Sequence, residues 1–218
     1  MVIRPRRGEA AGGGRVPLMR KPLATRNPLD IDFRIRAATR TDAARIAALH
    51  ARSWRAAYRG ILPDDYLDGR ATAELAAHWA DIFERSRYTD IALVLETDGG
   101  IAGFIAARLG GEAPFDAVID NLHIAPDQRG SGLGRPLLGA MAQVLADRGA
   151  TNACLWLFDG NTAAGRFYAR LGGIPDVGGF DDVDGRPVPH TRIVFQPLAR
   201  LIALCRAPQG NRRGIDAV

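Results

Sequence analysis

The chain has 218 residues, a net charge of +5 and a hydrophobic fraction of 47%, which suits one domain with an ordinary core. It contains no apolar run of about 18 or more residues, which excludes a membrane-spanning helix, and its basic N-terminus lacks the apolar stretch of a secretory signal. Its two cysteines, Cys154 and Cys205, do not form a disulfide framework, so we expect a cytoplasmic protein in a reducing environment.

The positive charge is concentrated at the two ends of the chain. The first 30 residues carry seven basic and two acidic side chains, and the last 20 residues carry four and one. The 168 residues between them therefore have a net charge of about −3. A folded nucleic-acid-binding surface normally carries a basic stripe on the domain itself, so this distribution argues against one. Nucleic-acid binding through the basic ends stays as an alternative, which would show a steep salt dependence.

Composition divides the chain into three parts. Residues 1–30 combine glycines, prolines and arginines with few periodic apolar residues, which is typical of a disordered leader. We expect a single folded domain over residues 31–198 and a basic C-terminal tail over residues 199–218.

The domain is predicted to begin with a strand over residues 33–37, where apolar and polar residues alternate. Thr39 and Asp42 then form a capping box at the start of a helix over residues 40–58. The elements expected after it are a helix (71–85), two hairpin strands (91–96 and 101–109), a strand (117–124), a helix (131–148), a strand (153–158), a short helix (161–171), and a last hairpin with its turn at Asp184-Gly185 and a strand over 191–195. This order indicates a single-domain α/β (α+β) fold with a largely antiparallel sheet and a parallel pair in its middle.

A glycine-rich loop follows the fourth predicted strand of the domain. It carries Gly130, Gly132 and Gly134 at alternate positions and leads directly into a helix. Glycine lets the backbone approach an anion closely, and a helix N-terminus adds unpaired N–H groups and a positive dipole end. We therefore predict a pyrophosphate-binding loop, with Arg129 and Arg135 adding positive charge at its sides. The alternative is a glycine-rich turn without a ligand.

The residue spacing in this loop excludes two other phosphate-binding motifs. It lacks the Gly-Lys-[Ser/Thr] ending of a P-loop, and its glycines follow G-x-G-x-G instead of the dinucleotide pattern G-x-G-x-x-G. The segment Arg129-x-x-Gly132-x-Gly134 after a strand instead resembles the acyl-CoA signature of the GNAT superfamily of N-acetyltransferases.

The resemblance covers about Phe33 to Pro197, in the same order of elements. It implies a central mixed, mostly antiparallel sheet of about seven strands with helices on both faces, and acetyl-CoA as cosubstrate. The backbone of Leu122, His123 and Ile124 would bind the pantetheine arm. The pyrophosphate would be bound by the backbone of the loop residues Arg129, Gly130, Ser131, Gly132, Leu133, Gly134 and Arg135.

A second segment, Asn161-x-x-Ala164-x-x-Phe167-Tyr168, resembles another motif of the same superfamily. Its spacing places Asn161, Ala164 and Tyr168 on one face of a helix. The resemblance implies that Asn161, Ala164 and Phe167 contact the cofactor. It places Tyr168 near the cofactor sulfur, where it would act as the general acid. On its own, the segment also fits a core helix with one buried tyrosine.

The resemblance implies direct attack of an amine on the thioester in a ternary complex, which requires a base. Asp120, two residues before Leu122, is our candidate and would act directly or through water. The superfamily often places a glutamate in this strand, and a hydrogen-bonded carboxylate at the strand edge is the alternative interpretation of Asp120. His123 is a weaker candidate, because strand alternation points it to the opposite face.

Two aromatic residues end the first predicted helix. Trp54 and Tyr58 lie four residues apart, and in the fold that the resemblance implies this helix walls the acceptor site. Their rings would hold an amine cation there, with core packing as the alternative. The histidines show no metal-ligand spacing, so we expect no metal. We interpret His50, His78 and His190 as structural or solvated residues.

The sequence therefore predicts an acetyltransferase that moves an acetyl group from acetyl-CoA to a primary amine. A small-molecule acceptor is favoured, because a domain charge of about −3 attracts cations. The alternatives are a protein N-terminal or lysine acetyltransferase and a non-catalytic acyl-CoA-binding regulator. Dimers are common among proteins of this resemblance, so a homodimer with its contact at the final strands is an expectation beside the monomer.

Overall fold

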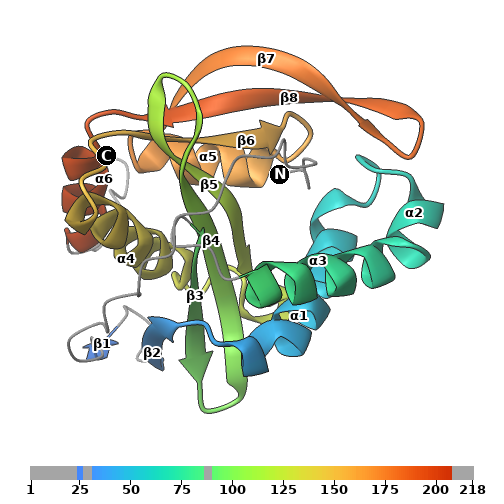
Figure 1. The fold of residues 1–218 in the computed structure, drawn as a ribbon, viewed down its shortest axis with the longest axis horizontal. Helices are drawn as coiled ribbons and strands as arrows, with labels where there is room; N and C mark the ends of the chain where they lie inside the picture. The colour runs from blue at the N-terminus through green and yellow to red at the C-terminus, as the bar shows by residue number, and fades with distance from the viewer. Residues whose placement is uncertain (1–23, 27–30, 86–89, 208–218) are drawn as a thin grey trace, which may run out of the picture.

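A single twisted sheet forms the centre of the molecule (Figure 1). The computed structural model describes residues 24–26, 31–85 and 90–207. The strands are β1 (Ala24–Arg26), β2 (Asp32–Ala37), β3 (Asp90–Thr97), β4 (Gly100–Glu112), β5 (Phe115–Ile124), β6 (Ala153–Phe158), β7 (Ile174–Val183) and β8 (Arg186–Phe195). Their order is β1-β2-β3-β4-β5-β6-β8-β7, with β5 and β6 parallel and all other neighbours antiparallel. Strands β2 to β8 confirm the predicted sheet of about seven strands, and β1 extends its edge.

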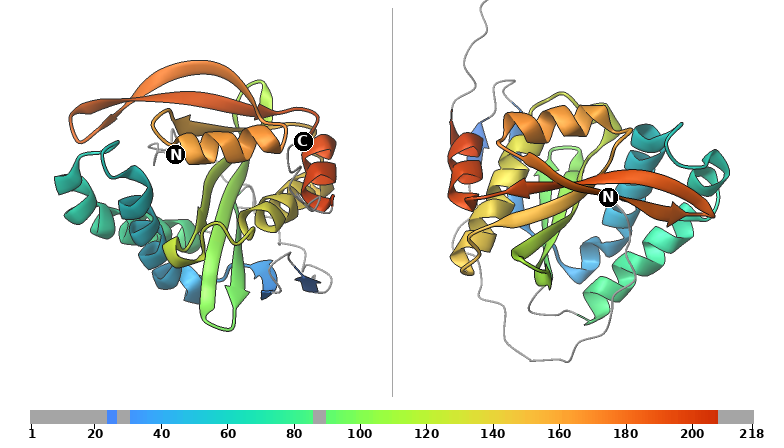
Figure 2. Two further views of the ribbon diagram at one scale, coloured as in Figure 1. Left: turned by 180° about the vertical axis from the view of Figure 1, so that it is seen from behind. Right: turned by 90° about the horizontal axis from the view of Figure 1, so that it is seen from above.

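Helices cover both faces of this sheet, as predicted (Figures 1 and 2). The helices are α1 (Ala43–Tyr58), α2 (Asp64–Asp68), α3 (Ala71–Arg85), α4 (Gly134–Asp147), α5 (Thr162–Arg170) and α6 (Leu198–Arg206). Strand β3 shows why both faces need cover. Leu93 and Leu95 pack with α4 on one side, and Val94 packs with α1 and α3 on the other. Side chains that alternate along a strand point to opposite faces, so a strand of continuous apolar residues is buried on both.

The capping box predicted before the first helix is present. The backbone N–H of Thr39 donates to the Asp42 carboxylate over 2.8 Å, within a 3-10 turn that precedes α1. Arg36 of β2 forms an ion pair with Asp42 at 2.7 Å, and this hydrogen-bonded guanidinium lowers the pKa of Asp42 to about 2. The start of α1 is thus fixed to the sheet, which orients the helix whose other end reaches the candidate site.

The structure differs from the predicted elements in three places. Helix α4 begins at Gly134 and not at residue 131, because Gly130 and Gly132 have φ angles of +80° and +82°, which no α-helix contains. The short helix α2 was not predicted. The predicted turn at Asp184-Gly185 is correct, with φ angles of +56° and +76°, but the strands that it joins are much longer than expected.

The chain ends also differ from the expected leader and tail. Within the predicted leader, Ala24–Arg26 forms β1 and pairs with β2, whereas residues 1–23 and 27–30 lie outside the described residues. The first residues of the predicted tail belong to α6, which packs against α4 through the buried side chain of Leu201. The sequence interpretation gave weight to the arginines of this segment and overlooked its apolar face. No helix in the described part of the chain is long and apolar enough to cross a membrane.

The burial of Leu201, which is 1% exposed, predicts that α6 contributes to the stability of the domain. Leu201→Ala should lower the free energy of unfolding by about 2 to 4 kcal/mol, measured by urea denaturation, because it leaves a cavity between α6 and α4. The exposed control Ala203→Ser should change it by less than about 0.5 kcal/mol. Equal stability of the Leu201 variant and the wild type would show that the segment is a tail after all.

Candidate active site

The parallel strands β5 and β6 separate soon after they meet. Among the residues that the structure describes, Val118 and Cys154 are the one pair in register between them. Farther along, residues 122–124 of β5 and residues 156–157 of β6 line a common cavity. Backbone groups on these facing edges have lost their neighbouring strand, so they are available to a ligand that enters between the strands.

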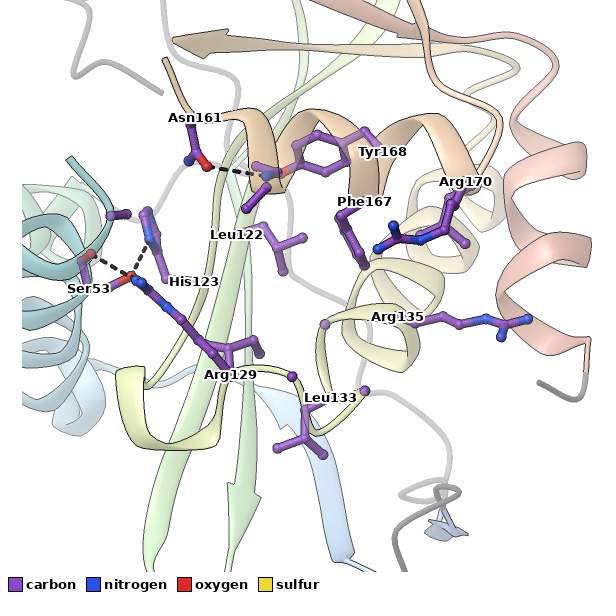
Figure 3. Close-up of a pocket in the computed structure, with 18 of the residues that line it drawn as sticks. Ser53, Leu122, His123, Arg129, Leu133, Arg135, Asn161, Phe167, Tyr168 and Arg170 are labelled. Atoms are coloured by element: carbon purple, nitrogen blue, oxygen red, sulfur yellow. Dashed lines mark hydrogen bonds between the residues drawn. The ribbon is translucent and has the colours of Figure 1, made fainter. Parts of the chain in front are cut away.

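The cavity has a volume of about 1190 Å³ and is bounded by α1, β5, the glycine-rich loop, β6, α5 and the end of α6 (Figure 3). This is enough space for a ligand larger than a typical drug-sized molecule. Most of the predicted site residues line it. They are Tyr58, Leu122, His123, Ile124, Arg129, Gly130, Ser131, Gly132, Leu133, Gly134, Arg135, Asn161, Ala164, Phe167 and Tyr168.

The glycine-rich loop presents backbone donors. The N–H groups of Gly130, Gly132 and Leu133 have no acceptor within the described chain. The positive φ angles of the two glycines give the loop a path that other residues rarely adopt, and a Cβ added at Gly130 would meet no atom within 4 Å. The loop leads directly into the N-terminus of α4. Unpaired N–H groups beside a helix N-terminus fit the diphosphate of an acyl-CoA.

The side chains of the two arginines that flank the loop form hydrogen bonds with neighbouring helices. Arg129 reaches α1, where its Nη2 donates to the backbone oxygen and to Oγ of Ser53 at 2.9 and 3.0 Å (Figure 3). Arg135 donates through Nε to the carbonyl of Leu204 over 3.1 Å, and through Nη2 to the carbonyls of Leu204 and Ala207 at the end of α6. Both arginines therefore attach the loop to neighbouring helices, a role that the sequence did not suggest.

Helix α5 contributes one face to the cavity, as its spacing predicted. Asn161 caps the helix, its Oδ1 accepting from the N–H of Ala164 over 3.2 Å. Tyr168 is 6% exposed, and its ring meets the ring of Phe167 edge-on at 5.2 Å. Burial, with a smaller contribution from Tyr58, holds the pKa of Tyr168 well above its usual value. The phenol is therefore protonated at neutral pH and can donate a hydrogen bond.

The two aromatic residues predicted for the acceptor site have separate positions. Tyr58 lines the cavity, and burial raises its pKa to about 12. Trp54 does not line the cavity. It is 3% exposed and packs in the core between Tyr58 and His50, so the structure supports the core-packing alternative for this residue.

Asp120, the residue predicted to act as the base, lies at an irregularity of β5. Strand β4 pairs with Ile119 and Asn121 on either side of it, so Asp120 is the extra residue of a β-bulge. Its carboxylate forms an ion pair with Arg108 of β4, and it does not line the cavity. No Asp or Glu side chain lines the cavity within the described residues.

A buried polar cluster joins α1 to β5 beside the cavity. Ser53 Oγ lies 2.9 Å from Nδ1 of His123, and the His123 ring lies 4.4 Å from the His50 ring. Burial lowers the pKa of His123 to about 3, so this side chain is neutral and a poor base. His50 is fully buried and its Nδ1 accepts from the indole N–H of Trp79 over 3.0 Å, which supports its structural interpretation.

The sequence analysis missed four polar or aromatic residues that line the cavity, namely Ser53, Gln128, Trp156 and Arg170. Ser53 is adjacent to Trp54 in a helix that was recognised by its apolar residues. Arg170 follows Phe167 by three positions, so the helical periodicity that identifies the motif could have drawn attention to it.

Residues 48–173 match the model of the acetyltransferase (GNAT) family. The chain belongs to this family. It is 28% identical over 131 residues to the uncharacterized N-acetyltransferase YuaI of Bacillus subtilis, an alignment that covers 58% of this chain and 72% of YuaI. It is 33% identical over 88 residues to an uncharacterized N-acetyltransferase of Archaeoglobus fulgidus, covering 38% of this chain and 60% of that protein.

Solved GNAT structures share the fold. A GCN5-related N-acetyltransferase from Rhodopseudomonas palustris superposes with a TM-score of 0.61 at 20% identity, covering 80% of this chain and 98% of that one. The PaiA N-acetyltransferase from Thermoplasma acidophilum, solved with coenzyme A, gives 0.59 at 19% identity, covering 73% and 97%. YncA from Salmonella typhimurium, solved with acetyl-CoA, gives 0.55 at 21% identity, covering 75% and 93%.

The bond between Ser53 and His123 predicts a measurable energetic coupling in this GNAT domain. Ser53→Ala should lower the free energy of unfolding by about 1 to 2 kcal/mol, because it leaves a buried imidazole nitrogen without a partner. In a His123→Phe background the same substitution should cost clearly less, since the imidazole nitrogen is then absent and the bond from Arg129 to the Ser53 hydroxyl is lost in both backgrounds. Urea denaturation of the four proteins measures both values, and identical losses in the two backgrounds would contradict the coupling.

Proposed function

We propose that the protein transfers an acetyl group from acetyl-CoA to a primary amine. The observation that carries this proposal is the cavity between β5 and β6, bordered on one side by unpaired loop N–H groups and on the other by a buried, protonated tyrosine. Membership of the GNAT family and relatives named as N-acetyltransferases support it.

Each end of the proposed cofactor site has residues suited to one part of acetyl-CoA. The loop N–H groups and the N-terminus of α4 would hold the diphosphate. The open edge of β5 at Leu122 to Ile124 offers backbone groups to the pantetheine arm, and Asn161 and Phe167 of α5 lie on the opposite side. When bound, acetyl-CoA supplies the activated thioester, and a backbone N–H of β5 would polarise its carbonyl.

Tyr168 is the proposed general acid. Burial keeps its phenol protonated at neutral pH, so Tyr168 can donate a hydrogen bond to a thiolate that departs beside it and pass its proton to the sulfur as the C–S bond breaks. Asp120 is retained as the proposed base only through an intervening water, since its carboxylate pairs with Arg108 and lies outside the cavity lining. His123 is too weak a base for this role because its pKa is about 3.

For the acceptor, we propose a small cationic amine. The net charge of about −3 between the basic ends would attract such a molecule over a distance. The class of acceptor is tested directly by measuring release of the CoA thiol from acetyl-CoA with a panel of polyamines, aminoglycosides and short peptides. Turnover with the peptides alone would contradict the small-molecule proposal and would indicate a protein N-terminus or lysine as the acceptor.

The role of Tyr168 predicts a selective kinetic defect. Tyr168→Phe should lower kcat by about 10- to 1000-fold, because the departing thiolate loses its proton donor, while the affinity for acetyl-CoA changes little. Tyr66→Phe is the matched control, because Tyr66 is buried outside the cavity and bonds Glu74 over 2.8 Å. A Tyr168 variant with the wild-type kcat would remove this residue from the mechanism.

We expect the glycine-rich loop to provide most of the affinity for acetyl-CoA. Gly132→Glu places a bulky anion at a positive φ angle beside the proposed diphosphate site, so it should abolish acetyl-CoA binding in isothermal titration. Gly99→Glu adds the same charge in the exposed turn between β3 and β4 and should bind as the wild type does. Undiminished binding by the Gly132 variant, or no binding by the wild type, would refute the proposed cofactor site.

A further inference from the structure

Within the described part of the chain, three arginines line the proposed cofactor cavity, and they differ in what their guanidinium groups contact. They are Arg129, Arg135 and Arg170. Arg129 donates to Ser53 on α1, and Arg135 donates to carbonyl oxygens at the end of α6. These bonds hold the two guanidinium groups against α1 and α6, so protein contacts and not a ligand fix their positions.

Arg170 is different, because it makes no hydrogen bond or ion pair with any residue in the described ranges. It is exposed, and it lies in the last turn of α5, across the cavity from the glycine-rich loop. Figure 3 shows its side chain running from the end of the helix toward Phe167, whereas Arg135 points away toward α6. Arg170 is thus the cavity arginine whose charge is not committed to the protein.

The position of Arg170 along the cavity suggests which part of a ligand it meets. Helix α5 follows the cavity from Asn161, near Tyr58 and β6, to Arg170 and Leu171, near the end of α6. At about 1.5 Å per residue, the nine steps from Asn161 to Arg170 extend over roughly 14 Å. Tyr168, the proposed proton donor, lies two positions before Arg170, but Figure 3 shows its ring directed back toward Asn161. Arg170 therefore lies beyond the end where the thioester is proposed, at a mouth also lined by Leu204 and Ala207.

Coenzyme A carries two phosphate-bearing regions, the diphosphate and the 3′-phosphate of its ribose. The unpaired N–H groups of the loop and the N-terminus of α4 suit the diphosphate, and they leave the 3′-phosphate without a partner. A terminal phosphate carries up to two negative charges and accepts paired hydrogen bonds from a planar guanidinium. A free arginine at the mouth of the cavity provides that complement.

We propose that Arg170 binds the ribose 3′-phosphate of coenzyme A and is the residue by which this chain distinguishes coenzyme A from dephospho-coenzyme A. The inference rests on the proposed function. On this inference, Arg129 and Arg135 position the loop, whereas Arg170 binds the nucleotide end of the cosubstrate.

Isothermal titration of the full chain with coenzyme A and with dephospho-coenzyme A tests the proposal. The wild type should bind coenzyme A about tenfold more tightly than dephospho-coenzyme A, the size expected for one partly exposed charge-assisted contact. Arg170→Ala should lose that preference by weakening coenzyme A alone, and Arg170→Lys should keep part of it. The wild-type preference should shrink between about 50 and 500 mM salt, because the contact is exposed to screening.

The matched control is Arg166→Ala on the same helix. Arg166 is also exposed but does not line the cavity, so this variant loses the same charge and should retain the wild-type preference. Equal weakening of both ligands by Arg170→Ala would overturn the assignment, since the arginine would then act on the diphosphate or on the fold. A wild type that binds both ligands equally would overturn only this inference, whereas one that binds neither would overturn the proposed function with it.

Discussion

The separation of β5 from β6 is the constraint on which the rest of the site depends. The two strands share the pair Val118 and Cys154 and then diverge, which leaves the facing backbone edges without the hydrogen bonds that complete a sheet. Unpaired backbone groups inside a protein are costly unless something else satisfies them. The surrounding elements hold the gap open instead of closing it, with α5 on one side, α1 on the other and the glycine-rich loop at its end.

The loop is kept in place from two directions. Arg129 attaches it to α1 through Ser53, and Arg135 attaches the first turn of α4 to the end of α6. A loop whose path is fixed before binding does not lose further conformational freedom when its N–H groups meet an anion. The cationic side chains of this segment thus serve mainly to organise backbone donors. Helix α6 thus helps to hold the loop in place through its bonds with Arg135, a role that the sequence did not suggest.

The sequence predicted what depends on local chemistry and periodicity. The glycine spacing of the loop, the helix face of Asn161 and Tyr168, and the capping box at Thr39 could each be identified within a few residues, and all three are present. The direction of long side chains could not be predicted in this way. Arg129 meets Ser53, 76 positions earlier, and Asp120 meets Arg108 through a bulge that no single-strand pattern reveals. Such contacts depend on register and tertiary packing, which strand alternation alone does not define.

Burial favours the neutral form of each titratable group at the inner end of the cavity. Burial raises the pKa of Tyr58 and Tyr168 and lowers that of His123, so all three are neutral near pH 7. Carboxylates are absent from the described lining as well. The same loss of solvation disfavours a bound ammonium relative to the free amine, so an acceptor that enters this end would lose its proton more readily than in water. On the proposed function, the environment itself then supplies part of what a dedicated base would otherwise have to provide, which is consistent with an Asp120 that faces Arg108 instead of the cavity.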